Sequence, residues 1–307
     1  MTTKSIASAL TRDASSQTYY TIRFLVDRER TADAYCAYAY FRWVDDTLDG
    51  GTASDLERMT FLERQKSLLQ KCTQGRLVRV ATPEENMLIE LVQHAAEKNS
   101  GLYSYLHNMM KVMEFDTHRR GRLISSSELN DYTRWLATAV TDAMHYFIGH
   151  SHSSPCDETR YLAVSGAHIT HMLRDTFDDL QAGYYNIPRE VLSSNRMRPH
   201  DIHSDTYRSW VQNRVQLARE YFQAGREYLR RVESLRCRLA GLAYTARFEW
   251  LLDTIEREGY FLRPEYSERK TLKTGLRMGW NILGSVTNVS SFKSLQSPVV
   301  SHSSRKS

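Results

Sequence analysis

The stretch from residue 33 to residue 49 reads DAYCAYAYFRWVDDTLD. Its apolar residues recur with a period near 3.6, which is typical of one buried face of an α-helix. Asp45 and Asp49 are four residues apart, so on a helix they share one face at roughly 6 Å along the axis. The stretch therefore predicts a long helix that ends in acidic side chains. The residues of its buried stripe are Cys36, Tyr40, Trp43, Val44 and Thr47.

The rest of the chain repeats this helical pattern. Only 14 Gly and 6 Pro occur in 307 residues, which disfavours an all-β sandwich, and the prolines fall between periodic segments. No segment shows sustained period-two alternation. We predict an all-α fold, in which the last two long helices form an antiparallel hairpin. The clearest expected helices cover residues 33–48, 83–97, 126–150, 158–181, 207–232 and 235–257.

Length and composition limit the class of protein. No linker divides residues 1–283, so we predict one helical domain, with a Ser-rich and disordered tail over residues 284–307. No apolar run reaches the ~18 residues of a membrane span. The net charge of +5 does not by itself imply nucleic acid. Four dispersed cysteines disfavour a disulfide framework or a Cys-rich zinc site, and a cytoplasmic location is the simplest interpretation.

A second acidic motif occurs at residues 168–179, HITHMLRDTFDD. His171, Asp175 and Asp179 recur every four residues, with His168 one turn earlier and Arg174 beside them. Carboxylates at this spacing repel each other on a helix, and a bound cation would remove that cost.

Two such motifs suit Mg²⁺, which prefers carboxylate oxygens together with substrate phosphates. Two facing helices would hold a Mg²⁺–diphosphate cluster, and an apolar helical cavity would exclude water from the carbocation left behind. The simplest alternative for either motif is a solvated acidic face. A di-iron bundle would need Glu-x-x-His pairs, which are missing here. We expect His145, His150 and His152 to be surface or capping residues.

These motifs resemble those of the squalene/phytoene synthase family. Residues 15–50 and 168–188 are similar to the family's two aspartate-rich regions, and residues 112–140 and 238–266 are similar to its middle and last core helices. The resemblance implies a single-domain isoprenoid-synthase helical bundle with a central cavity and a Mg²⁺-dependent reaction on a prenyl diphosphate. It also implies metal ligands at Asp45, Asp49, Asp175 and Asp179, and diphosphate contacts at Arg42 and Arg174.

Departures from the family pattern concentrate in the part of the substrate site where the family binds its second prenyl chain. Gln17 and Thr18 follow Ser15 in the entry segment, and His168 and His171 replace the usual Gln and Asn. The family's V-A-G-T-V-G run is LATAVT at residues 136–141, so both of its glycines carry side chains here, Thr138 and Thr141. Phe248 lacks a hydroxyl that the family commonly has. We expect Tyr20, Thr138 and Phe248 to line the substrate site.

The preferred hypothesis is a prenyltransferase that joins one allylic diphosphate to a non-isoprenoid, aromatic, for example carbazole-like, acceptor. His168 or His171 would accept the proton that the arene releases. The alternatives are head-to-head condensation of two prenyl diphosphates, a terpene cyclase, and a non-catalytic binding or assembly protein. A basic run, Arg263, Arg269, Lys270, Lys273 and Arg277, is either a solvated helix face, a cap on the diphosphate entrance, or a contact with an anionic membrane.

Overall fold

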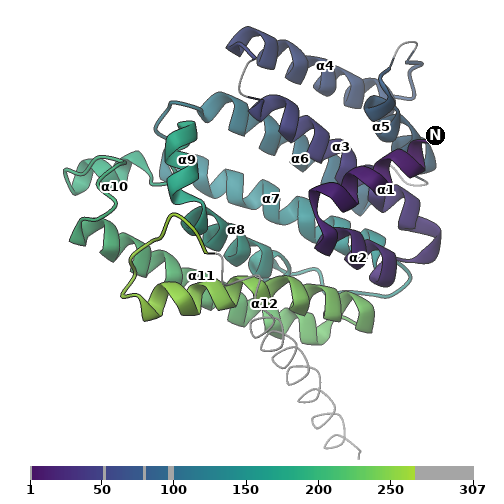
Figure 1. The fold of residues 1–307 in the computed structure, drawn as a ribbon. Coiled ribbons are helices and arrows are strands. Elements are labelled where there is room, and N and C mark those ends of the chain that lie inside the picture. Colours follow the sequence, from purple (N-terminus) through teal and green to yellow (C-terminus); the bar gives the residue numbers. More distant parts are fainter. Residues whose placement is uncertain (1, 51–52, 79–80, 96–99, 267–307) are drawn as a thin grey trace, which may run out of the picture.

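A computed structural model describes residues 2–50, 53–78, 81–95 and 100–266 of the chain (Figure 1). In this part of the chain every regular element is a helix, which confirms the all-α prediction. The proposed domain end at residue 283 and the tail over residues 284–307 lie outside the described residues. The elements are α1 (Thr3–Ala14), α2 (Ser16–Leu25), η1 (Arg28–Arg30), α3 (Thr31–Asp49), α4 (Asp55–Thr73), α5 (Pro83–His94), α6 (Gly101–Arg119), α7 (Ser126–Phe147), η2 (Glu158–Tyr161), α8 (Leu162–Arg174), α9 (Thr176–Ala182), α10 (Arg189–Ser194), α11 (Asp205–Arg231) and α12 (Leu235–Arg257).

The helix starts follow local capping chemistry. Thr82 and Ser125 form capping boxes with Glu85 and Glu128, in which each hydroxyl accepts from a backbone N–H and each carboxylate accepts from the cap N–H. These boxes explain why α5 and α7 begin where the sequence predicts. The predicted extension of α7 to residue 150 is wrong, because the backbone of Ile148 is extended.

The predicted continuous helix over residues 158–181 is also wrong. It is divided into η2, α8 and α9, with a break at Asp175, whose backbone leaves the helical region (φ −92°, ψ 8°). Directly after the break, the Thr176 hydroxyl donates to the carbonyls of Met172 and Leu173 at 2.9 and 3.2 Å. The second motif therefore lies on both sides of a kink.

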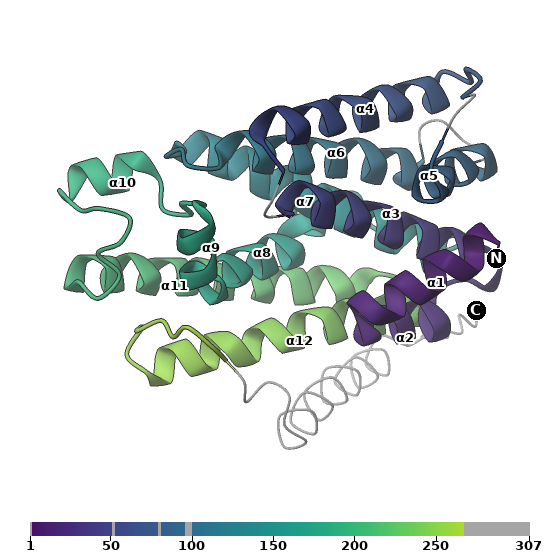
Figure 2. The ribbon, with the colours of Figure 1, turned by 45° about the horizontal axis from the view of Figure 1, so that its top comes forward.

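The helices pack around two apolar clusters. One cluster is built mainly from α1 to α7, and the other from α8, α10, α11 and α12. Figure 2 shows α11 and α12 as one layer and α3, α6 and α7 as the layer across from it. The α11–α12 pair is the predicted hairpin. Within the described residues, no helix has both the length and the apolar character required to cross a membrane.

The buried carboxylate of Glu85 links α4 to α5. Its oxygens accept from Arg64 Nε and Nη2 at 2.6 and 2.7 Å, from Gln65 Nε2 at 3.0 Å and from the Thr82 N–H at 2.9 Å. The Arg64 hydrogen bonds lower the pKa of this carboxyl to about 2, against desolvation, which raises it. The ionised form is therefore the one that stabilises the fold.

We expect Glu85→Gln to lower the free energy of unfolding at pH 7 by about 2–3 kcal/mol. In the wild type this contribution is complete above the unfolded pKa of about 4.5 and is lost as the pH falls towards about 2. Urea denaturation at pH 7 and pH 3 measures both values. Glu57→Gln is the matched control, because Glu57 forms the same capping box at the exposed start of α4. An equal loss in the two variants would contradict this role of Glu85.

Candidate active site

The first acidic motif lies at the C-terminal end of α3. Arg42 binds Asp46 through two hydrogen bonds, from Nε at 3.0 Å and from Nη2 at 2.5 Å, and lies 3.7 Å from Asp45. Asp49 accepts from the Tyr184 hydroxyl at 3.2 Å. Asp46 thus neutralises Arg42, whereas Asp45 is half-buried and Asp49 is exposed.

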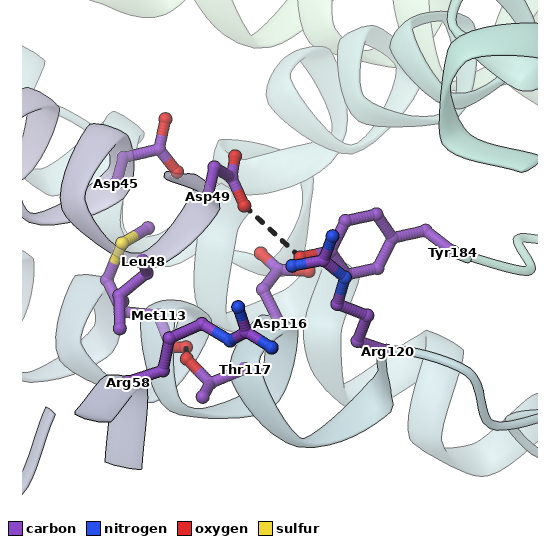
Figure 3. A pocket seen from close by; sticks show the side chains of 9 residues that line it. All are labelled: Asp45, Leu48, Asp49, Arg58, Met113, Asp116, Thr117, Arg120 and Tyr184. Carbon is purple, nitrogen blue, oxygen red and sulfur yellow. Dashed lines mark hydrogen bonds between the residues drawn. The ribbon is translucent and has the colours of Figure 1, made fainter. Parts of the chain in front are cut away.

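A small pocket brings a third carboxylate to this motif (Figure 3). Asp116 of α6 lines it together with Asp45 and Asp49, and Tyr184 approaches from the opposite side. The Asp116 carboxylate accepts from Tyr132 Oη at 2.8 Å and from Arg119 Nε at 2.6 Å. This network fixes the carboxylate where α3 and α6 meet.

Arg119 connects the first motif to the second. Arg119 is 5% exposed, and its guanidinium also donates from Nη1 to Asn186 Oδ1 at 2.8 Å. Asn186 in turn donates from Nδ2 to Asp179 Oδ2 at 2.5 Å. A chain of contacts therefore runs from Asp116 to Asp179. On α8, Arg174 binds the adjacent Asp175 through two hydrogen bonds of 2.5 and 2.6 Å.

The electrostatics of the site suit a bound cation. Burial raises the pKa of Asp45 to about 7, repulsion by Asp49 adds to the rise, and Arg42 opposes it. Burial also raises the pKa of Asp179 to about 7, against the Asn186 hydrogen bond and with repulsion from Asp175. At both carboxylates the nearby arginine, Arg42 or Arg119, does not offset burial and the repulsion by the neighbouring aspartate.

Carboxylate oxygens from two motifs are the donor set that Mg²⁺ prefers. In the described part of the chain, no three or more His, Cys, Asp or Glu side chains are grouped closely enough to bind one ion. Metal binding here would require additional oxygen ligands, and a substrate diphosphate carries such oxygens.

A cavity of about 600 Å³ opens directly beside these carboxylates. Asp45, Met113 and Asp116 line both the carboxylate pocket and the cavity. The other wall residues come mainly from α2, α3, α6, α7, α8, α11 and α12, and most are apolar or aromatic. They include Ile22, Tyr38, Phe41, Tyr105, Leu136, Met144, Phe147, Val164, Leu229 and Tyr244.

The two candidate bases occupy different environments. His171 lines the cavity, and its ring packs edge-to-face on Phe248, which is buried behind the wall. His168 is 5% exposed and lies outside the lining. Its Nδ1 is 3.1 Å from Thr133 Oγ1, a hydroxyl that donates to the Leu129 carbonyl, so Nδ1 is the donor in this contact. Burial lowers the pKa of His168 to about 3, which makes it a weak proton acceptor.

The three residues expected to line the substrate site, Tyr20, Thr138 and Phe248, do not line the cavity, and Phe248 is buried behind its wall. Tyr20 is 54% exposed and stacks on Phe24, while Thr18 and Thr21 of the same helix line the wall. Thr138 is half-buried and outside the lining, whereas Thr141, one turn further along α7, is in it.

The expectation that His145 is a surface or capping residue is wrong. Its Nε2 lies 2.9 Å from the Tyr228 hydroxyl, and burial lowers its pKa to about 4. Of the basic run at residues 263–277, only Arg263 lies in the described part, and it pairs with Glu258.

The sequence motifs did not identify several polar residues of the site. Arg119 and Asn186 act through contacts that join distant segments. Asn186 lies in the segment after the second motif that resembles the family pattern, and this resemblance is the one sequence signal for it. Arg247 of α12 lines the cavity and donates from Nη1 to Gln17 Oε1 at 3.1 Å. Its guanidinium packs over the rings of Tyr244 and Phe248. Its sequence context is an ordinary helix face.

Comparison with known proteins places this geometry in a family. The family model for squalene/phytoene synthase matches residues 11–274. A chloroplastic phytoene synthase of Cucumis melo is 23% identical over 283 residues, which cover 88% of this chain and 65% of the melon protein. Phytoene synthase 2 of Solanum lycopersicum, also chloroplastic, is 24% identical over 271 residues, 84% of each protein.

Solved structures share the fold. A squalene synthase from Alicyclobacillus acidocaldarius superposes with a TM-score of 0.66 at 19% identity, covering 85% of this chain and 95% of the other. A dehydrosqualene synthase in complex with a ligand superposes with a TM-score of 0.71 at 14% identity, covering 94% and 97%. The chain belongs to the squalene/phytoene synthase family, whose members are prenyltransferases that use prenyl diphosphates, and it has the isoprenoid-synthase fold.

Proposed function

We propose that this protein is a Mg²⁺-dependent prenyltransferase that transfers one prenyl group from an allylic diphosphate to a non-isoprenoid, aromatic acceptor. The observation that carries the proposal is the position of the apolar cavity, which opens on Asp45 and Asp116. A diphosphate beside the carboxylates would leave its prenyl chain inside this cavity. The wall would then exclude water from the allylic cation.

Residues of the two acidic motifs would bind the diphosphate and its metal ions from two ends of the site. Asp45 and Asp49 would bind metal on one side of the diphosphate, and Asp175 and Asp179 on the other. Mg²⁺ held there would neutralise the charge that develops as diphosphate leaves. Arg42 of α3 and Arg174 of α8 would donate to the diphosphate oxygens.

Transfer of the prenyl group to the acceptor requires that the allylic cation and the acceptor are positioned together and that one residue accepts a proton. The C–O bond to diphosphate breaks, an acceptor carbon forms a C–C bond to the allylic carbon, and the arene then loses a proton. His171 is better placed to accept it than His168, because it lines the cavity and His168 is buried outside the lining.

Head-to-head condensation is the second candidate, and the names of the relatives favour it. Phytoene, squalene and dehydrosqualene synthases are all among the proteins that this chain resembles. The aromatic-acceptor proposal rests instead on the replaced residues, since His171 and Thr141 both line the cavity. His171 brings a polar group to a space that in head-to-head condensation would hold a second hydrocarbon chain, and Thr141 adds side-chain volume to its wall.

Product analysis separates the two candidates. The protein is incubated with Mg²⁺ and dimethylallyl, geranyl, farnesyl or geranylgeranyl diphosphate, with and without carbazole, and the products are identified by mass spectrometry. We expect the carbazole mass to increase by one prenyl group with at least one donor, and no C30 or C40 hydrocarbon to form. A C30 or C40 hydrocarbon made without any acceptor would overturn the proposal in favour of head-to-head condensation.

A further inference from the structure

One arginine of the cavity wall has no carboxylate partner. Among the residues that the structure describes, three arginines line the cavity, and two of them, Arg42 and Arg160, each pair with an aspartate. The third is Arg247 of α12, which forms no ion pair with any described residue. Its Nη1 donates to the neutral amide oxygen of Gln17 at 3.1 Å. Arg247 therefore brings to the cavity a positive charge that no carboxylate in the described part of the chain neutralises.

The guanidinium of Arg247 can be reached from the cavity. Gln17 and Tyr244, which it contacts, both line the wall themselves. Arg247 is half-buried and Gln17 is exposed, so their hydrogen bond lies where the wall meets solvent. The guanidinium carbon is 4.9 Å from the centroid of the Tyr244 ring and 4.5 Å from that of Phe248. These contacts hold the charged group at the rim of the cavity, between α2 and α12.

Arg247 is also close to the second acidic motif. The ring of Phe248, over which its guanidinium packs, makes an edge-to-face contact with His171 at 5.2 Å between centroids. His171 lines the cavity one helical turn before Asp175. The charge of Arg247 therefore lies on the same part of the wall as the start of this motif.

Electrostatic interactions connect Arg247 to the arginines of both motifs. Burial lowers the pKa of Arg247, and the positive charge of Arg174 lowers it further, against neighbouring tyrosines that include Tyr38. Tyr38 acts on Arg42 as well, whose pKa is lowered by burial and raised by its aspartate partners and by Tyr38. Arg42, Arg174 and Arg247 thus approach one region of the site from α3, α8 and α12.

An oxyanion is the ligand that suits this arrangement. A partly buried charge without a counter-ion is unfavourable, and a guanidinium binds phosphate oxygens through its fork of N–H groups. A prenyl chain and a neutral arene carry no negative charge that could offset the arginine. The diphosphate of the donor carries such charge, and it would lie beside the two acidic motifs that Arg42 and Arg174 belong to.

We propose that Arg247 binds the diphosphate of the prenyl donor from the α12 side of the site, as a third arginine beside Arg42 and Arg174. The inference rests on the proposed function in one respect, the diphosphate beside the acidic motifs, and does not depend on the acceptor. The contact consists of hydrogen bonds from the guanidinium to phosphate oxygens, and no proton is transferred.

A matched pair of ligands tests this contact without turnover. The probes are the S-thiolodiphosphates of dimethylallyl, geranyl, farnesyl and geranylgeranyl alcohol, in which sulfur replaces the bridging oxygen and slows ionisation. The one that wild type binds most tightly with Mg²⁺ is compared with its parent alcohol by calorimetry. Arg247→Met should raise the dissociation constant of the thiolodiphosphate about 10- to 100-fold, the effect of one charged hydrogen-bonding group, and should leave that of the alcohol unchanged. Arg247→Lys keeps the charge without the fork and should give an intermediate value.

Arg238 provides the matched control on the same helix. Like Arg247, it has a buried Nε without a hydrogen-bond partner, but it does not line the cavity. Arg238→Met removes the same charge and should leave the affinity for the thiolodiphosphate unchanged. Arg247→Met breaks no ion pair of the described chain, so its melting temperature without ligand should stay within a few degrees of wild type. A weaker affinity then reports a lost contact and not a loss of folding.

The anion could also belong to the acceptor, and a second pair of probes tests this. Carbazole-3-carboxylic acid and carbazole differ in one carboxylate, and Arg247→Met should bind each of them as wild type does. A loss of affinity for the acid alone, with the thiolodiphosphate bound as in wild type, would overturn the inference and assign the charge to the acceptor.

Three further results would overturn the inference. They are unchanged thiolodiphosphate binding in Arg247→Met, an equal loss in Arg238→Met, and a wild-type protein that binds none of the four analogues. The first two, with prenyl transfer to carbazole intact, would leave the proposed function standing. A C30 or C40 hydrocarbon made without acceptor, alongside weaker thiolodiphosphate binding in Arg247→Met, would overturn the proposed function and leave the Arg247 contact standing.

Discussion

Asp45→Asn lowers the rate of diphosphate release by about a thousandfold, because it removes a carboxylate that would bind metal. Loss of several kcal/mol of transition-state charge stabilisation corresponds to a factor of this size. Stopped assays of released diphosphate, with a saturating prenyl diphosphate and Mg²⁺, measure it. Asp131→Asn is the matched control, since Asp131 is an exposed carboxylate paired with Arg134 on the surface of α7. Wild-type rates in Asp45→Asn would contradict the assignment of Asp45 as a metal ligand.

The same substitution should stabilise the metal-free protein. Burial and Asp49 raise the pKa of Asp45 to about 7, so the folded state binds a proton that the unfolded state has already released. Stability of the metal-free wild type therefore falls as the pH rises from about 4 through 7, and this loss is complete at pH 8. The Asp45 side chain is 41% exposed, so solvent screens part of the repulsion. We expect a rise of about one or two degrees in the melting temperature of Asp45→Asn at pH 8.

Arg119→Met should cause the largest loss of stability among the substitutions considered. The Arg119 side chain is buried and pairs with Asp116 at 2.6 Å, and its second contact is with Asn186. Removing it leaves the half-buried Asp116 carboxylate with the Tyr132 hydroxyl as its remaining donor and the Asn186 amide oxygen without the Arg119 donor, and breaking a pair of this kind typically costs about 3–5 kcal/mol. Urea denaturation at pH 7 measures this loss.

The exposed pair on α7 supplies the control for Arg119. Arg134→Met breaks the ion pair with Asp131, whose side chains are 71% and 43% exposed, and should cost less than about 1 kcal/mol. Arg119→Lys keeps a positive charge but not the forked geometry, so its stability should lie between those of wild type and Arg119→Met. Equal losses in Arg119→Met and Arg134→Met would contradict the role of Arg119 as the link between the two motifs.

The sequence predicts the helices of this fold well because their signals are local. The apolar period over residues 33–48 and the capping residue Ser125 each depend on neighbours within a few positions. The break at Asp175 has no comparable local signal, because Thr11, Thr170 and Thr254 make the same backward hydrogen bond as Thr176 inside unbroken helices. The sequence therefore predicts a continuous helix across this position.

The sequence predicts only part of the site. Four-residue spacing identifies the two acidic motifs, and the family resemblance suggests their partners. The contact between Arg119 and Asn186 joins segments 67 residues apart, and only the packing of the helices brings them together. The sequence also does not show that Thr18 rather than Tyr20 lines the cavity, because a period of 3.6 does not fix which face of a short, polar helix turns towards a cavity.

The stoichiometry of diphosphate release tests the proposed reaction most directly. The protein, Mg²⁺, carbazole and the donor that supports the highest rate are incubated, and diphosphate and prenylated carbazole are quantified in the same samples. Transfer of one prenyl group to an aromatic acceptor predicts one diphosphate per molecule of prenylated product and no hydrocarbon when carbazole is left out. Two diphosphates per molecule of a C30 or C40 hydrocarbon, formed without carbazole, would contradict it.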